Sequence, residues 1–257
     1  MVRIGWMTAA LVVGMTTLPP LRAAAQWKTP WTYEGPLGAE HWSELDPAYA
    51  ACNTGKSQSP IDIRNPEKAD LPALRFDYHS GPLEFLINNG YTIRVNYHDA
   101  AGSGNFLFVG DVRYHLTQFH FHRPSEESIR GKPWAMAVHL MHESSDGKIA
   151  GVTVLLQAGK ANPTVQQIWD RMPEAKGDEE AIAGVSVNPA GLLPPDRAYY
   201  TYTGSITAPP CTEGVTWIVL KTPVEVSPEQ ISAFSRLYPH DVRPLQPLNG
   251  RVVLESR

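Results

Sequence analysis

Short runs of apolar residues, several with alternating polar positions, dominate the chain from Leu83 onward. They are EFLI, YTIRVNY, NFLFV, VRYHLTQFHFH, WAMAVHLMH and IAGVTVLLQ, and a further run extends from Val215 to Leu220. Runs of this length predict β-strands, and Asn89-Gly90 is a turn signal between the first two. The pattern therefore predicts a mainly β, single-domain fold, built on a large, twisted and mostly antiparallel central sheet.

Helical signals are few and short. Asn162 and Pro163 form a helix start, and Ser227 to Gln230 match a capping box. Apolar residues follow each start at helical spacing: Val165, Ile168, Trp169 and Met172 in the first, and Ile231, Phe234 and Leu237 in the second. We expect both helices to lie on the surface, each with one face packed on the sheet.

The N-terminus has the three-part pattern of a secretory signal. Arg3 precedes an apolar run from Ile4 to Leu18, and Ala23-Ala24-Ala25 stands before Gln26. The run is shorter than the roughly 20 apolar residues of a membrane-spanning helix. Residues 1–25 are therefore predicted to be a signal peptide and 26–257 the mature domain, periplasmic or secreted, with no membrane anchor after cleavage.

Composition narrows the class of partner. The chain is 42% hydrophobic and 19% charged, with a formal net charge of -4, so one large core is expected. No run of Lys and Arg with interleaved aromatics occurs, and nucleic acid is not an expected partner. Between residues 27 and 62 the chain is rich in Trp, Tyr, Gly and Pro, which predicts an irregular arm packed on the surface by its aromatics.

The two cysteines, Cys52 and Cys211, lie far apart in the sequence. In an exported chain the oxidising compartment makes a disulfide the default, and closing so long a loop contributes on the order of 4 kcal/mol in the chain-entropy model. The alternative is a pair of buried free thiols.

The stretch QFHFHRPSEE, residues 118–127, carries the first candidate chemistry. Read as a strand, it places His120 and His122 on one face and Phe119 and Phe121 on the other. Taken alone, His-x-His is also typical of a polar pair on a solvated face.

A third histidine strengthens the metal hypothesis. His139 follows Gly131-Lys132-Pro133, which leaves room for the chain to turn and return beside the first strand. Three imidazoles with a fourth position left to water are the catalytic arrangement of zinc, whereas structural sites use four protein ligands. The three histidines therefore predict a catalytic zinc site.

Several widely spaced motifs resemble the α-class carbonic anhydrases, in particular the exported bacterial type. The resemblance runs in order from about Trp31 to Arg251, and its motifs are EHW at 40–42, GKSQSPIDI at 55–63, QFHFHRPSEE, HLMH, YTGSITAPPCTEGVTW and RPLQPLNGR at 243–251. It implies a zinc enzyme, a carbonate dehydratase, that interconverts carbon dioxide and bicarbonate.

The resemblance also implies roles for individual residues. His120, His122 and His139 match the zinc ligands. Thr207 and Glu126 match the pair that orients the zinc-bound hydroxide, since a Thr207 hydroxyl that donates to Glu126 can only accept from the nucleophile. Further matches are Gln118 beside the ligands, a disulfide between Cys52 and Cys211, and a carbon dioxide pocket of Ile206, Met141, Val215 and Trp217, residues that are equally compatible with ordinary core.

One departure from the family concerns the third ligand. Ligand histidines usually present their second ring nitrogen to an acceptor. In the family, a glutamate two residues before the third ligand does this, and a histidine follows the orienting glutamate; here those positions hold Ala137 and Glu127. We expect Glu127 to cross the small Ala137 side chain and accept the hydrogen bond of His139. The alternative is that Glu127 is a surface charge.

A second departure concerns proton transfer. Tyr91 stands where many fast members carry a proton-shuttling histidine, and a phenol with a pKa near 10 is a poor relay at neutral pH. We expect turnover to be limited by proton transfer, with His79, His98 and His115 as alternative relays. In addition, Ala208 follows Thr207 where a second threonine is common, which removes one hydroxyl from the pocket.

Two other functions remain open from the sequence. A cupin-type enzyme would use Glu126 as a metal ligand and favour iron or manganese. A secreted, non-catalytic binding module on the same scaffold is the other.

His142 matches a structural histidine of the family and is left out of the metal site. Whether the protein forms a homodimer is left open by the sequence.

Overall fold

The computed structural model describes residues 29–257 except 84, 98–103, 181 and 183, so the expected signal peptide lies outside the described residues. Within the described part of the chain, no helix has the length and apolar character needed to cross a membrane. The helices are short: η1 (Gly35–Leu37), α1 (Trp42–Leu45), η2 (Pro47–Tyr49), α2 (Ala51–Thr54), α3 (Pro163–Trp169), η3 (Pro189–Leu192) and α4 (Pro228–Leu237).

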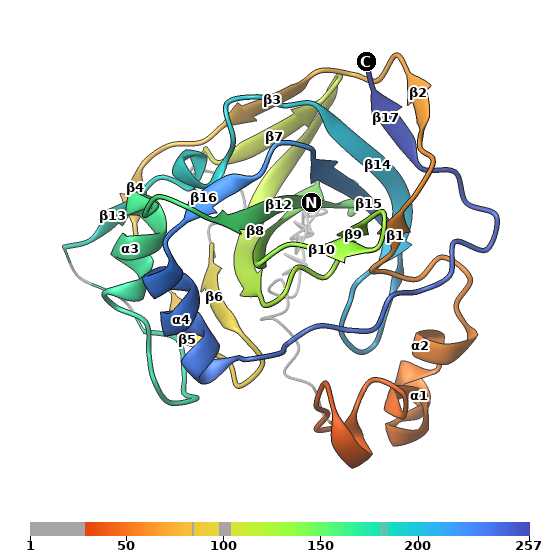
Figure 1. Cartoon of the computed structure of the whole chain (residues 1–257), viewed down its shortest axis with the longest axis horizontal. Helices are drawn as coiled ribbons and strands as arrows, with labels where there is room; N and C mark the ends of the chain where they lie inside the picture. The colour runs from red at the N-terminus through yellow and green to blue at the C-terminus, as the bar shows by residue number, and fades with distance from the viewer. Residues whose placement is uncertain (1–28, 84, 98–103, 181, 183) are drawn as a thin grey trace, which may run out of the picture.

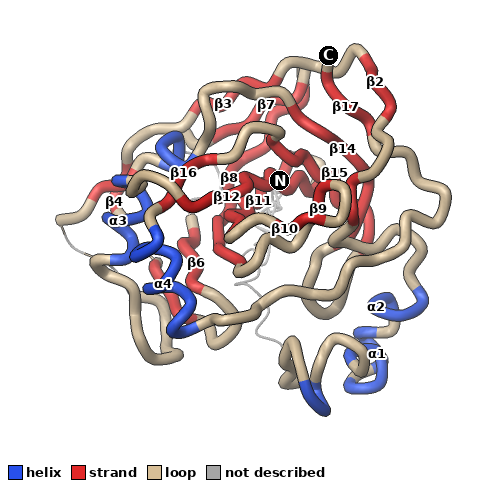
Figure 2. Tube along the Cα trace, in the orientation of Figure 1, coloured by secondary structure: helices blue, strands red, loops and turns tan. Residues whose placement is uncertain are grey.

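Strands make up most of the regular structure (Figures 1 and 2). They are β1 (Asp62–Ile63), β2 (Glu67–Ala69), β3 (Leu74–Asp77), β4 (Gly81–Pro82), β5 (Leu86–Asn88), β6 (Ile93–Asn96), β7 (Phe106–Val109), β8 (Val112–His122), β9 (Ser128–Ile129), β10 (Lys132–Pro133), β11 (Met136–Ser144), β12 (Ile149–Ala158), β13 (Ser186–Val187), β14 (Tyr199–Ser205), β15 (Glu213–Leu220), β16 (Val224–Val226) and β17 (Leu254–Ser256).

One sheet organises the molecule. Its strand order is β2-β17-β14-β15-β12-β11-β8-β6-β5, with β16 on β12 and with β3 and β7 attached at β8. Most neighbouring strands are antiparallel. The parallel pairs in this sheet are β12 with β15, β12 with β16, and β17 with β2. The predicted fold class is therefore confirmed, and the sheet is mixed rather than purely antiparallel.

The alternation in β8 separates the core from the opposite face of the sheet. Phe119 and Phe121 are fully buried in the largest hydrophobic cluster, where Leu140 of β11 lies beside Phe119. His120 and His122 project to the other face, as the period of two predicts. The buried phenylalanines thus fix the strand that presents the histidines.

The two predicted helix starts are confirmed and are joined to each other. The Asn162 side chain accepts from the backbone of α3, and Ser227 and Gln230 form both bonds of a capping box at α4. Gln230 Oε1 also accepts from the backbone N–H of Asn162 at 2.9 Å, which ties the two helices together at one side of the molecule (Figure 1). The first helix ends at Trp169, earlier than its apolar pattern suggested, and Met172 lies in the turn before Pro173, which cannot continue a helix.

The N-terminal arm packs by its aromatic residues, as predicted. Trp31, Trp42 and Tyr49 are buried in a cluster that includes Cys52 and Cys211. These cysteines form a disulfide across 159 residues, which confirms the predicted bridge and excludes free thiols. The bridge joins the arm to the loop between β14 and β15.

Candidate metal centre

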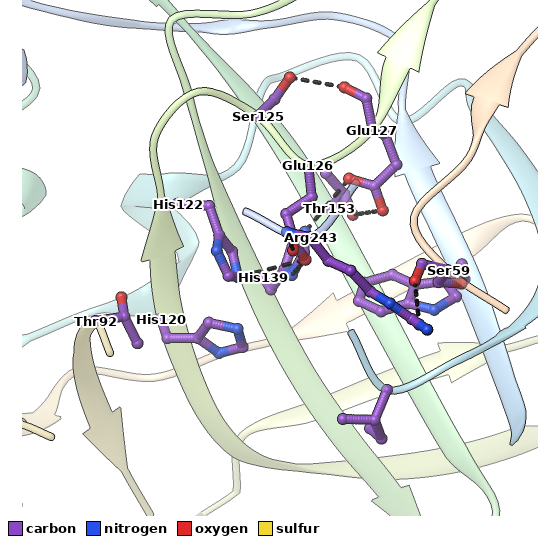
Figure 3. Close-up of polar contacts among 12 residues, drawn as sticks. Ser59, Thr92, His120, His122, Ser125, Glu126, Glu127, His139, Thr153 and Arg243 are labelled. Carbon is purple, nitrogen blue, oxygen red and sulfur yellow. Dashed lines mark hydrogen bonds and ion pairs between the residues drawn. The ribbon is translucent and has the colours of Figure 1, made fainter. Parts of the chain in front are cut away.

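Three histidines converge on one face of the sheet (Figure 3). His139 on β11 lies directly opposite His120 on β8, and His122 is two residues further along β8. One ring nitrogen of each lies within 4.8 Å of those of the others. The predicted hairpin return is therefore present, with the short strands β9 and β10 between the two long ones.

The outer nitrogen of each imidazole has an acceptor. Nδ1 of His120 lies 2.8 Å from Oε1 of Gln118, and Nδ1 of His122 lies 2.7 Å from the backbone oxygen of Asp241. Nε2 of His139 lies 3.3 Å from Oε2 of Glu127. These contacts fix the tautomers so that the remaining nitrogens carry lone pairs.

Two of the inner nitrogens have no hydrogen-bond partner in the described part of the chain. Nε2 of His122 and Nδ1 of His139 are buried and make no hydrogen bond there. Leaving a buried polar atom unpaired costs about 1 to 3 kcal/mol. A metal ion bound between the rings would satisfy both atoms, so the donor set fits a metal.

Burial favours the neutral form of two of the three histidines. Burial, followed by the charge of the neighbouring imidazoles, lowers the pKa of His120 and His122 well below the usual value. Burial also acts to lower the pKa of His139, but the charge and hydrogen bond of Glu127, with the charge of Glu126, raise it overall. Neutral imidazole is the form that binds zinc.

Glu126 lies beside the same cluster. Its Oε1 accepts from the backbone N–H of Arg243 at 3.0 Å, and its Oε2 lies 3.6 Å from Nε2 of His122. Burial raises the pKa of Glu126 to about 7, although His139, the nearby Thr207 hydroxyl and the Arg243 amide each act to lower it. Oε2 does not reach hydrogen-bonding geometry with any described residue, so it remains an acceptor turned toward the site.

Glu127 is fully buried, which excludes a surface charge. Besides its contact with His139, its Oε1 accepts from Oγ1 of Thr153 at 3.1 Å. Ala137, two residues before His139 on β11, is also fully buried, and its methyl group offers no hydrogen-bond acceptor to His139. The contact expected from the sequence is therefore present, and its role is taken up below.

A pocket opens over the three histidines. Met141, Ile206 and Trp217 line it, as do Gln118, Thr207 and Ala208. Val215 is not among the lining residues; it is 1% exposed and packs in the same hydrophobic cluster as Met141 and Trp217. Trp217 lies opposite Gly151 in the sheet, where an added Cβ would come within 2.7 Å of the indole ring.

Tyr91 also lines the pocket and stacks on Trp31 of the arm, with ring centroids 4.0 Å apart. Burial raises its pKa further from neutral pH. His79 and His115 are absent from the lining, and His98 lies outside the described residues.

His142 is not part of the metal centre. Both of its ring nitrogens make hydrogen bonds elsewhere, one with the Tyr78 hydroxyl and one with the Ala150 carbonyl.

Sequence reasoning missed three residues that form hydrogen bonds with the predicted site side chains. Asp241 acts through a backbone carbonyl, which no side-chain pattern reveals, and Thr153 stands in an ordinary strand run. Arg243 belongs to the motif RPLQPLNGR, and that motif was the available signal, but its backbone contact with Glu126 requires the fold.

Comparisons with known proteins agree with this geometry. The family model for eukaryotic-type carbonic anhydrase matches residues 37–257. A carbonic anhydrase of Nostoc sp. is 42% identical over 231 residues, covering 88% of this chain and 86% of that protein.

Solved structures give the same result. The α-carbonic anhydrase of Thermovibrio ammonificans, in complex with the inhibitor sulfanilamide, superposes with a TM-score of 0.83 at 41% identity, over 88% of this chain and 99% of that one. A dioscorin complexed with ascorbate gives 0.80 at 34% identity, over 88% and 97%. By fold, sequence and the arrangement of its histidines, the chain belongs to the eukaryotic-type, or α-class, carbonic anhydrase family.

Proposed function

We propose that the protein catalyses the zinc-dependent, reversible hydration of carbon dioxide to bicarbonate and a proton. The observation that carries the proposal is the set of three imidazoles whose outer nitrogens are occupied and whose inner nitrogens face one point. Three nitrogen ligands with an open fourth position suit catalytic zinc. Zinc held in carbonic anhydrase sites lowers the pKa of water to about 7, a general property of the class, and so supplies hydroxide near neutral pH.

Glu126 and Thr207 would orient the nucleophile. The Arg243 amide fixes one oxygen of Glu126, and the other is free to accept from the Thr207 hydroxyl. A hydroxyl that donates its proton to Glu126 can accept only from the nucleophile, which directs a lone pair toward the substrate carbon. Such fixed orientation contributes to rate by reducing the entropy lost at the barrier.

Gln118, Asp241 and Glu127 would hold the ligand rings in position. Each accepts a hydrogen bond from a different imidazole, and partners of this kind are worth about 10- to 100-fold in metal affinity. Glu127, in the turn after β8, would accept the hydrogen bond of His139 in place of a side chain at Ala137, which has no acceptor.

Carbon dioxide is small and apolar, and Met141, Ile206 and Trp217 give the pocket an apolar wall to receive it. The product proton has no efficient relay at Tyr91, because a phenol with a raised pKa does not exchange protons readily at pH 7. Proton transfer to buffer would then limit turnover.

Export would place this reaction outside the cytoplasmic membrane. Residues 1–25 would act as the signal peptide and 26–257 as the catalytic domain, periplasmic or secreted. The disulfide between Cys52 and Cys211 supports an oxidising compartment.

The other two functions have less support. The cupin alternative requires Glu126 as a ligand, but the ligand cluster consists of three histidines and the family match is to carbonic anhydrases. The binding-module alternative has in its favour that a similar structure, a dioscorin, binds ascorbate. In this chain, Glu126 and Thr207 accompany all three histidines, which favours catalysis.

The test is stopped-flow hydration of carbon dioxide by protein of measured zinc content, before and after chelation. We expect activity that follows bound zinc and is lost in His139→Ala. His41→Ala, which removes a histidine of the N-terminal arm outside the pocket, is the control. A zinc-loaded protein that hydrates carbon dioxide no faster than buffer would overturn the proposal.

A further inference from the structure

Arg94 is a charged residue in a pocket that is otherwise aromatic, apolar or neutral. It lies on β6 directly opposite the ligand His120 on β8, and it lines the pocket. Apart from the histidines, every other lining residue is uncharged at neutral pH. A permanent positive charge therefore stands beside the metal centre.

The guanidinium of Arg94 has no hydrogen bond or ion pair with any described residue, and its Nε is buried. The buried Arg243 differs: it donates to Gln58 Oε1, Ser59 O and Cys52 O at 2.7 to 2.8 Å. Arg94 is thus an arginine whose donors are not used by the fold.

Burial opposes the charge of Arg94. Desolvation lowers its pKa, and the charge of Glu179 acts in the opposite direction. The Glu179 carboxylate accepts a hydrogen bond from the side-chain amide of Asn96. A partly buried cation without a hydrogen-bonded partner is unfavourable for folding, and an anion entering the pocket would relieve that cost.

Apart from the histidines, the polar and the apolar residues that line the pocket lie on different strands of the sheet. Arg94 and Gln118 lie on β6 and β8, whereas Met141 and Trp217 lie on β11 and β15. Because the sheet runs β15-β12-β11-β8-β6, the charged side and the apolar side face each other across the histidines. A neutral substrate and an anionic product can therefore contact different walls.

We propose that Arg94 is an anion-binding residue that holds bicarbonate in the pocket, an inference that rests on the proposed function. The guanidinium fork presents paired N–H donors that match a planar, trigonal oxyanion. Nitrate has the same shape and charge without being a substrate, so it serves as the probe.

The experiment compares Arg94→Gln and Arg94→Lys with the full-length parent protein. Nitrate and bicarbonate affinities are measured from the visible spectrum of cobalt-substituted protein, and nitrate inhibition is measured on zinc-loaded enzyme. Loss of one charge-assisted contact predicts about tenfold weaker anion binding in Arg94→Gln. Arg94→Lys should bind with intermediate affinity, because it keeps the positive charge but loses the paired N–H donors of the guanidinium group. Arg113→Gln, which removes an exposed arginine from the far end of β8, should leave both affinities unchanged.

Thermal unfolding separates binding from a structural role. Because the fold makes no use of the Arg94 donors, the unfolding midpoint of Arg94→Gln should equal or exceed that of the parent. Parent-like anion affinity in Arg94→Gln, with or without a lower midpoint, would overturn the role of Arg94 while leaving carbon dioxide hydration intact. An inactive zinc-loaded parent would instead overturn the proposed function.

Discussion

Replacing Glu127 by glutamine tests how the third ligand is held. The carboxylate accepts from Nε2 of His139 at 3.3 Å and from Oγ1 of Thr153 at 3.1 Å. An amide of the same size has one acceptor oxygen and no charge, so it can keep the His139 contact only as a weaker, neutral one. We expect Glu127→Gln to retain the fold and to bind zinc less tightly.

The size of the effect follows from the contact. Outer partners of ligand histidines are worth about 10- to 100-fold in metal affinity, which corresponds to about 1.4 to 2.8 kcal/mol. The 3.3 Å separation is long for a charge-assisted hydrogen bond, so we place Glu127→Gln near tenfold. Glu127→Ala removes both acceptors and should approach a hundredfold.

The assay is equilibrium competition for zinc with a chelator of known affinity, read as bound metal rather than activity. Glu143→Gln is the matched control, because Glu143 is an exposed carboxylate on the same strand as His139. Parent-like zinc affinity in Glu127→Gln would refute the assigned role of Glu127.

A coupled exchange sharpens the test. Glu127→His together with Ala137→Glu would restore the arrangement implied by the family resemblance, and should bind zinc more tightly than Glu127→His alone. Ala137→Glu by itself places a second carboxylate in a fully buried space and should destabilise the protein. Additive effects of the two changes would show that the positions are independent.

Three further changes probe the pocket and the fold. Tyr91→His should raise turnover in weak buffer about tenfold or more and abolish stimulation by added imidazole, whereas an unchanged buffer response would mean that another relay operates. Gly151→Ala places a methyl group 2.7 Å from the Trp217 ring, and stopped-flow assays should show a lower kcat/KM for carbon dioxide at full zinc content. Replacing Cys52 and Cys211 together by serine should lower the free energy of unfolding by about 5 kcal/mol in denaturant titrations, and an unchanged midpoint would contradict the chain-entropy argument.

The parts of the fold that the sequence predicted are those controlled by neighbours along the chain. The alternation in residues 112–122 places Phe119 and His120 on opposite faces because strand geometry alone decides it. The Ser227 capping box likewise depends on residues within one turn of helix. Met172 was assigned to a helix from its spacing, but the helix ends at Trp169, because Pro173 cannot continue it. The helix-breaking effect of proline here outweighs the apolar periodicity.

The parts of the site that the sequence did not predict depend on distant backbone. The carbonyl of Asp241 reaches His122 across 119 residues, and backbone groups carry no residue-specific pattern. Val215 was expected to line the pocket, yet it is 1% exposed and packs within the hydrophobic cluster that also contains Trp217. Local sequence gives the face of a strand and leaves open which side chain on that face reaches a cavity.

Glu126 and Glu127 show how adjacent residues come to serve opposite sides of one imidazole. Oε2 of Glu126 lies 3.8 Å from Nδ1 of His139, and Oε2 of Glu127 lies 3.3 Å from Nε2. Two buried carboxylates around one ring are unfavourable without a cation, because each loses its hydration. A divalent ion at Nδ1 would balance both charges, so the same metal that completes the ligand set would also stabilise the second carboxylate. In the family arrangement a glutamate stands at the position of Ala137, whereas here the carboxylate comes from Glu127. The number of buried carboxylates around the metal site is therefore the same, and only the chain segment that supplies the acceptor for His139 differs.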